Sequence, residues 1–147
     1  MESAAIVKSW NDLSVSLVVS GQEANSVSWL IESQLVDSEV ISSSEGVGIY
    51  SGPGWATLTV DERHSEGADG QAAELVRILS PRKPALDALR EAGKAVKVDV
   101  AGVTESGSGL YISPDVLAGL AELGVPVTFT TVRESGEDEE DPLAWLG

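Results

Sequence analysis

The run from Leu110 to Val132 constrains the fold more than any other part of the chain, because it predicts a helix with two defined ends followed by a strand. Ser113-Pro114-Asp115 is typical of a helix start: a hydroxyl cap, a proline whose missing N–H costs nothing there, and an acid near the positive helix end. Gly124 follows where a left-handed residue commonly ends a helix. The predicted apolar stripe of this helix consists of Val116, Leu117, Leu120 and Leu123. We expect the β-rich residues 125–132 to form the final strand.

Three earlier segments alternate apolar and polar residues, as strands with one buried face do. They are residues 13–20, 55–60 and 95–103. In the last of them Val96, Val98 and Val100 are expected to face the core, with Lys97 and Asp99 facing water. Short edge strands are expected at 40–41 and 47–50, and further helices at 24–35, 71–79 and 84–92.

This order of elements predicts an α+β fold. We expect a ferredoxin-like sandwich in which a mixed or antiparallel sheet carries its helices on one face. A doubly wound parallel sheet would need strands that are apolar on both faces.

A chain of 147 residues is long enough for one domain with a real core. We expect that domain to span residues 1–133 and to be followed by an acidic C-terminal tail, 134–147. The chain has no cysteine, which excludes disulfides and thiolate metal sites. Because neither a leader pattern nor a membrane-length apolar run is found, we expect a soluble, cytoplasmic protein.

The formal net charge of −15, from 24 acids against 9 bases, is the strongest global signal. It argues against nucleic-acid and membrane partners, since both are anionic and require cationic patches. Two interpretations remain open: the charge serves solubility alone, or it attracts a basic protein partner.

The acids gather at two places, which we take as candidate partner-binding surfaces. The first is the loop after the strand at 55–60, and the second is the tail. The candidate residues are Asp61, Glu62, His64, Glu66 and Asp69 in the loop, and Glu137, Asp138, Glu139, Glu140, Asp141 and Trp145 in the tail. Because no nucleophile elbow, phosphate loop or calcium loop is present, we expect no catalytic, cofactor-binding or metal-binding residue.

The four tryptophans divide into different expectations. Trp55 begins a predicted strand and is expected in the core, whereas Trp10 and Trp29 are expected at partly exposed edges. Trp145 either folds back onto the sheet edge or contacts another protein as an aromatic anchor. The basic residues of the helix pair are expected to form surface ion pairs with the many acids; they are Arg77, Arg82, Lys83, Arg90 and Lys94.

The C-terminal half resembles a known bacterial family. The matching stretches are residues 109–117 and 120–129, together with Leu79-Ser80-Pro81 and the strand at 96–100. They are similar to the end and middle of the family called domain of unknown function 4279. The resemblance implies a small α+β domain with no assigned activity and no catalytic residue to carry over. By analogy, such small bacterial domains resemble immunity proteins, which bind and neutralise a toxin.

The leading hypothesis is therefore a non-enzymatic, protein-binding domain: an immunity protein whose acidic surface covers a basic toxin such as a nuclease. One alternative is an enzyme or small-ligand domain with a pocket between sheet and helices, for which His64 and Tyr50 are the first candidates. Another is a homo-oligomeric module that pairs through an exposed strand edge.

Overall fold

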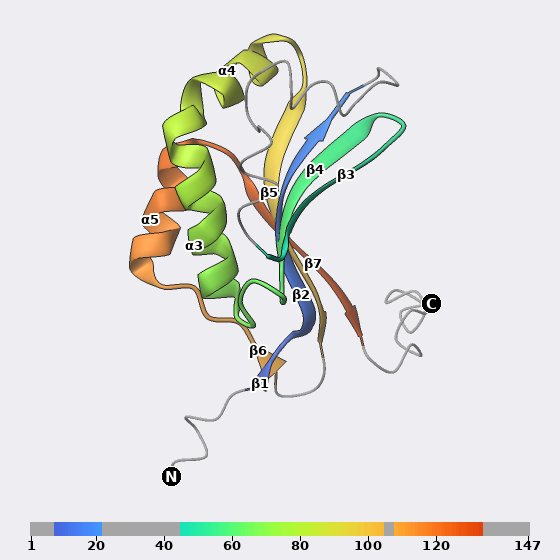
Figure 1. The fold of residues 1–147 in the computed structure, drawn as a ribbon, viewed down its shortest axis with the longest axis vertical. Coiled ribbons are helices and arrows are strands. Elements are labelled where there is room, and N and C mark those ends of the chain that lie inside the picture. Colours follow the sequence, from blue (N-terminus) through green and yellow to red (C-terminus); the bar gives the residue numbers. More distant parts are fainter. Residues whose placement is uncertain (1–7, 22–44, 105–107, 134–147) are drawn as a thin grey trace, which may run out of the picture.

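The centre of the molecule is β2 (Asn11–Ser20), whose alternating sequence buries Leu13, Val15, Leu17 and Val19 on one face. The computed structural model describes residues 8–21, 45–104 and 108–133. β2 lies in a five-stranded sheet with β3 (Val47–Gly52), β4 (Trp55–Asp61), β5 (Ala95–Thr104) and β7 (Val127–Arg133). The strand order is β3-β4-β2-β5-β7 (Figure 1).

The sheet is mixed. The pairs β3–β4, β4–β2 and β2–β5 are antiparallel, whereas β5–β7 is parallel. It follows that β2 and β3 run in the same direction, with the antiparallel β4 between them. In the same way β4 and β5 run in the same direction, with the antiparallel β2 between them. The pair β4 and β5, which α3 and α4 connect, therefore has the geometry of a split β-α-β unit.

Three helices lie on one face of this sheet (Figure 1): α3 (Ala68–Leu79), α4 (Lys83–Glu91) and α5 (Pro114–Leu123). A 3₁₀ turn, η2 (Ser80–Arg82), joins α3 to α4. A separate two-stranded parallel sheet pairs β1 (Lys8–Ser9) with β6 (Ser108–Gly109). No helix in the described ranges is long and apolar enough to cross a membrane.

The core fills the space between the helices and the sheet. Its rows run across the strands: Leu58 pairs with Leu17, which pairs with Val98 on the other side. From the helices come Leu75 and Leu79 of α3, Leu86 and Leu89 of α4, and Leu120 and Leu123 of α5. At about 25 cal/mol per Å², burial of these side chains is the main force that holds the helices on the sheet.

The predicted helix at 114–123 is confirmed at both ends. The Ser113 hydroxyl accepts a hydrogen bond from the Val116 N–H at 3.3 Å, and Gly124 is left-handed with φ +73°. One residue of the predicted stripe is wrong, because Leu117 is half exposed while Val116 and Leu120 face the core. Each helical residue turns about 100° from the last, so Leu117 falls at the border of the apolar face.

The predicted strands at 47–50, 55–60 and 95–103 are confirmed, as is the edge position of the first. The helices at 71–79 and 84–92 are confirmed as well, although α3 begins three residues earlier. The predicted helix at 24–35, the strand at 40–41 and Trp29 lie outside the described residues. The α+β class with a mixed sheet is thus observed.

Candidate functional site

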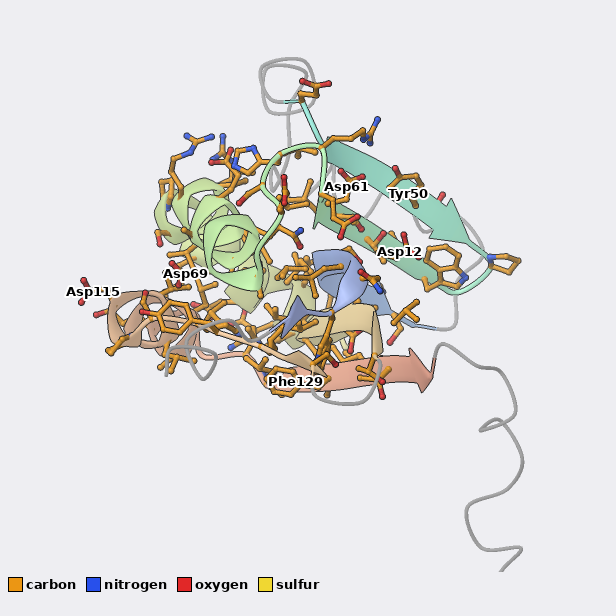
Figure 2. All side chains as sticks on the ribbon, turned by 90° about the horizontal axis from the view of Figure 1, so that it is seen from below. Asp12, Tyr50, Asp61, Asp69, Asp115 and Phe129 are labelled. Atoms are coloured by element: carbon orange, nitrogen blue, oxygen red, sulfur yellow. The ribbon has the colours of Figure 1, made fainter. Side chains whose placement is uncertain are left out.

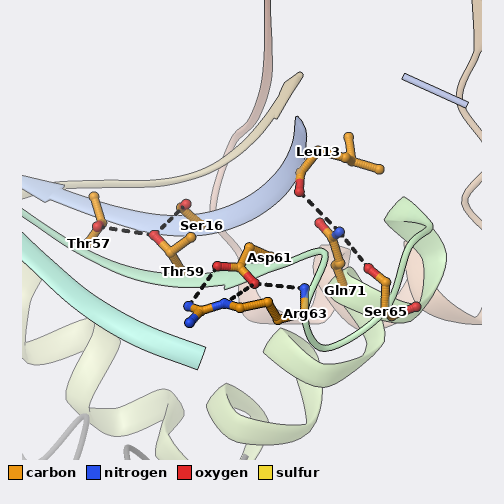
Figure 3. A network of polar contacts seen from close by, with 8 residues as sticks. All are labelled: Leu13, Ser16, Thr57, Thr59, Asp61, Arg63, Ser65 and Gln71. Carbon is orange, nitrogen blue, oxygen red and sulfur yellow. Dashed lines mark hydrogen bonds and ion pairs between the residues drawn. The ribbon is translucent and has the colours of Figure 1, made fainter. Parts of the chain in front are cut away.

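The predicted acidic loop, 61–69, connects the end of β4 to the start of α3. Its first residue, Asp61, is held by Arg63: the backbone N–H of Arg63 donates to Asp61 Oδ1 at 2.9 Å, and the guanidinium donates to both carboxylate oxygens at 3.2 and 3.0 Å (Figure 3). These bonds to Arg63 hold the pKa of Asp61 below its ordinary value, against a smaller opposing effect of burial. The negative charge of Asp61 is therefore paired with the positive charge of Arg63.

Two further acids of the loop bind backbone groups of the fold. Glu62 accepts a hydrogen bond from the Leu13 N–H at 3.2 Å, which joins the loop to β2. Asp69 accepts one from the Ser113 N–H at 2.7 Å, which joins the start of α3 to the cap of α5. Charge-assisted bonds of this kind are stronger than neutral ones. The Glu62 carboxylate therefore holds the loop to β2, and the Asp69 carboxylate holds α3 to the start of α5.

His64 lies against α3. Its Nε2 is 3.9 Å from Glu74 Oε1, and Glu74 is only 8% exposed. Arg77 holds the same carboxylate in a bidentate pair, with bonds of 2.8 and 2.6 Å. These contacts with Glu74, chiefly the hydrogen bonds, raise the pKa of Arg77. His64 therefore lies beside the Glu74–Arg77 ion pair of α3.

Gln71 is the residue that sequence reasoning missed in this region. Its side chain is fully buried, and its Nε2 donates to Leu13 O at 3.1 Å and to Ser65 O at 2.8 Å (Figure 3). A polar residue at the first position of a predicted helix gives no sign of burial, because its partners are a distant strand and the preceding loop. Gln71 therefore holds the loop, at Ser65, and the strand β2, at Leu13, to the start of α3.

Of the five candidate residues in the loop, Glu66 is an exposed acid without a hydrogen bond or ion pair to the other described residues. Asp61, Glu62 and Asp69 each have the partner described above. The tail candidates, Glu137 to Asp141 and Trp145, lie outside the described residues.

The distribution of charge is uneven. Twelve acids and all nine bases lie in the described residues, a formal charge of −3. The other twelve acids lie in segments 1–7, 22–44, 105–107 and 134–147, which contain no lysine or arginine. Segment 134–147 alone contains six of them. Segment 134–147 is therefore the most acidic stretch of the sequence, with six acids and no base in fourteen residues.

The basic residues of the helix pair follow the prediction in part. Arg77 pairs with Glu74 and Arg90 pairs with Asp87, as expected of surface ion pairs. Arg82 instead donates to the carbonyl oxygen of Ile78 at 2.8 Å, and Arg90 also donates to that of Leu123 at 3.0 Å. Bonds to the final carbonyls of a helix are favourable for a cation because of the helix dipole.

The face of the sheet opposite the helices carries a second group of polar side chains. The Ser16 and Thr59 hydroxyls are 2.8 Å apart, and the Thr59 hydroxyl donates to that of Thr57 at 3.2 Å (Figure 3). Farther along, the Thr128 and Thr130 hydroxyls both donate to Asp99 Oδ1, at 2.6 and 2.8 Å. We call this surface the open face, defined by Ser14, Ser16, Thr57, Thr59, Asp61, Asp99, Thr128 and Thr130.

Trp55 and Tyr50 border the open face, and here one prediction is wrong. Trp55 is 40% exposed instead of buried in the core, because it has the same strand phase as Thr57 and Thr59, opposite to Ala56 and Leu58. Its indole covers Gly52, where a Cβ would approach within 2.5 Å of Nε1. Trp10 is partly buried as expected and covers Gly102.

Tyr50 lies beside Asp61 (Figure 2), and its side chain adds to the rise in the pKa of Arg63 that Asp61 mainly causes. It is 49% exposed, and its ring covers Gly48. Tyr50 thus extends from β3 over the open face, whereas His64 lies against α3.

Within the described ranges, no group of three or more His, Cys, Asp or Glu residues could hold a metal ion. Comparison with models of protein families, with curated proteins and with solved structures finds no match to this chain.

Proposed function

We propose that this protein binds a basic protein partner without catalysing a reaction, as an immunity protein that neutralises a basic toxin such as a nuclease. The observation that carries the proposal is the division of charge. The chain has a formal charge of −15, and segment 134–147 concentrates six of its 24 acids without any lysine or arginine. A concentrated acidic segment attracts a cationic partner from a distance and accelerates its association.

The loop and the tail have different roles in this proposal. Three of the loop acids bind Arg63, the Leu13 N–H and the Ser113 N–H, so the loop contributes Glu66 and a defined shape. The tail supplies six acids, five of them in succession: Glu137, Asp138, Glu139, Glu140 and Asp141. Trp145 follows them as an aromatic anchor, a residue type enriched at interfaces.

The experiment begins with capture of partners from the source organism at low salt, followed by association kinetics with the main partner. Neutralising Glu137, Asp138, Glu139 and Glu140 as Gln or Asn should slow association about tenfold at low salt. The matched control neutralises Asp87, Glu91, Asp115 and Glu122, four exposed acids on the helices. We expect this control to have a much smaller effect.

Raising the salt concentration should slow association of the unmodified protein and should have little effect on the tail-neutralised variant. An acidic partner, or association that is independent of salt, would contradict the proposal. Neutralisation of a toxin is tested by producing the captured partner in cells with and without this protein and measuring survival.

We further propose that the domain is ferredoxin-like, with its first helix between β2 and β3. Support comes from the order β5-β2-β4-β3, in which all neighbouring strands are antiparallel. In a ferredoxin-like domain this order results from two split β-α-β units, each of which places one strand between the two strands of the other. The parallel β7 is an addition next to β5. The resemblance to the domain of unknown function 4279 family stays a prediction.

A further inference from the structure

The outer edge of β7 has backbone groups that point away from the sheet. β7 pairs in parallel with β5, and the Val98 N–H donates to the Pro126 carbonyl oxygen at 2.8 Å. In a parallel ladder alternate residues bond to the same neighbour, so Thr128 and Thr130 continue the bonds to β5. The N–H and C=O groups of Val127, Phe129 and Thr131 therefore point outward. No other strand in the described part of the chain pairs with this edge.

This edge lacks the usual protection against pairing. Edge strands of soluble proteins commonly carry a lysine, a proline or a bulge that prevents another strand from adding. Residues 127–132 read Val-Thr-Phe-Thr-Thr-Val, without a charge or a proline, and the β5–β7 register runs from Val127 to Arg133 without a shift. At its centre, Phe129 is 55% exposed. The strand is a good template for another strand.

We propose that a second copy of this chain pairs with β7, antiparallel, about a two-fold axis that passes beside Phe129. In this register Phe129 lies opposite its own counterpart, and Val127 lies opposite Thr131. The outward backbone groups of these three residues then form about six hydrogen bonds between the copies. The interface is self-complementary and closes at two copies, so it makes a dimer and not a fibre.

Charge favours this edge over the rest of the surface as the contact between copies. Each chain carries a formal charge of −15, so two copies repel, and the repulsion is smallest where the contacting surfaces carry no charge. Asp99 is the carboxylate beside β7 on the open face, and the Thr128 and Thr130 hydroxyls already bind it. Three strand spacings, about 14 Å, would separate it from its counterpart. That distance exceeds the Debye length of about 8 Å at physiological salt.

The proposed contact is small, and the dimer is therefore weak. One strand per copy and the exposed Phe129 ring bury less than the roughly 1,200 Å² of a standard stable interface. We expect reversible association that depends on protein concentration. Salt should strengthen it about threefold between 20 and 300 mM NaCl, because screening reduces the repulsion between copies. A basic partner attracted by the acidic segments has the opposite salt dependence.

Sedimentation of the full chain over a range of protein and salt concentrations tests the dimer. The variant Thr131→Pro removes an outward N–H but no bond to β5, and it should weaken association about tenfold, or about 1.4 kcal/mol. Phe129→Lys should have a similar effect by placing a charge on the edge. If Thr131→Pro disturbs the fold, as circular dichroism would show, Phe129→Lys decides. A dimer that both variants leave unchanged would overturn the proposal.

Cysteine crosslinking tests the register, because the chain has no native cysteine. Phe129→Cys places the two Cα atoms about 5.5 Å apart, within disulfide range. We expect fast oxidation to a covalent dimer. Thr130→Cys lies diagonal to its counterpart, beyond about 7 Å, and should react slowly. Tyr50→Cys, at the opposite edge (Figure 2), is the control for random collision.

Equal rates for the three cysteine variants would overturn the proposed pairing. So would a protein that stays monomeric at every concentration. In that monomer, slow hydrogen exchange at the Val127, Phe129 and Thr131 amides would show that another segment of the same chain covers the edge.

Discussion

The two edges of the sheet are built in different ways. In β3, glycines at 48 and 52 allow the rings of Tyr50 and Trp55 to lie across the backbone. Gly46, just before it, contacts the loop at His64. β7 has no glycine and an uncharged run of β-branched and aromatic residues. We call β3 the closed edge, because these rings and the 61–69 loop pack against it, and β7 the open edge. The comparison teaches that two edge strands of one sheet can differ in what packs beside them.

The largest effect is expected where the closed edge meets the loop. Gly46 has φ +86°, and a Cβ there would lie 2.3 Å from the His64 backbone nitrogen. Gly46→Ala should therefore lower the free energy of unfolding by about 3 kcal/mol, by adding a backbone clash to the left-handed strain. Urea denaturation measures it.

Gly93→Ala is the matched control, because Gly93 has φ +90° but nothing within 4 Å of an added Cβ. It should cost about 1 kcal/mol, the left-handed strain alone. Equal losses for the two variants would mean that the contact with His64 contributes nothing.

A smaller effect is expected at the open edge, where Asp99 joins β5 to β7 through two threonine hydroxyls. Asp99→Ala should lower the free energy of unfolding by about 1 kcal/mol. It should also accelerate hydrogen exchange in β7 more than in β3. Asp99→Asn keeps an acceptor oxygen and should lose less. If Ala and Asn variants behave alike, the hydrogen bonds do not hold the edge.

The smallest effect is the pH dependence at the closed edge. Because the hydrogen bonds from Arg63 lower the pKa of Asp61, their contribution to stability is complete above the unfolded pKa, about 3.8. It is lost as the pH falls through the lower folded value. The difference in unfolding free energy between the natural protein and Arg63→Gln should therefore shrink from pH 5 to pH 2.5. A constant difference would show that Arg63 acts through packing instead.

The candidate site was predictable in composition but not in geometry. The cluster of acids at 61–69 is plain in the sequence, yet Glu62 binds the N–H of Leu13, 49 positions away, and Asp69 binds that of Ser113, 44 positions away. No local pattern indicates such bonds, because they depend on how the sheet and the helices meet. The position of Trp55 is different. Alternation with Thr57 and Thr59 already indicates the open face, and the size of the residue misled the prediction.

The sequence by itself determined the elements and their buried faces. Ser113 marks the start of α5 and Gly124 marks its end, and the alternation in β2, β4 and β5 determines which side chains face the core. The sequence determines both because these effects act between residues a few positions apart. Only the tertiary structure decided which carboxylates are bound, and which strands form the closed and open edges. Strand order and register join residues distant along the chain, and that pairing leaves β7 with one neighbour in the described sheet.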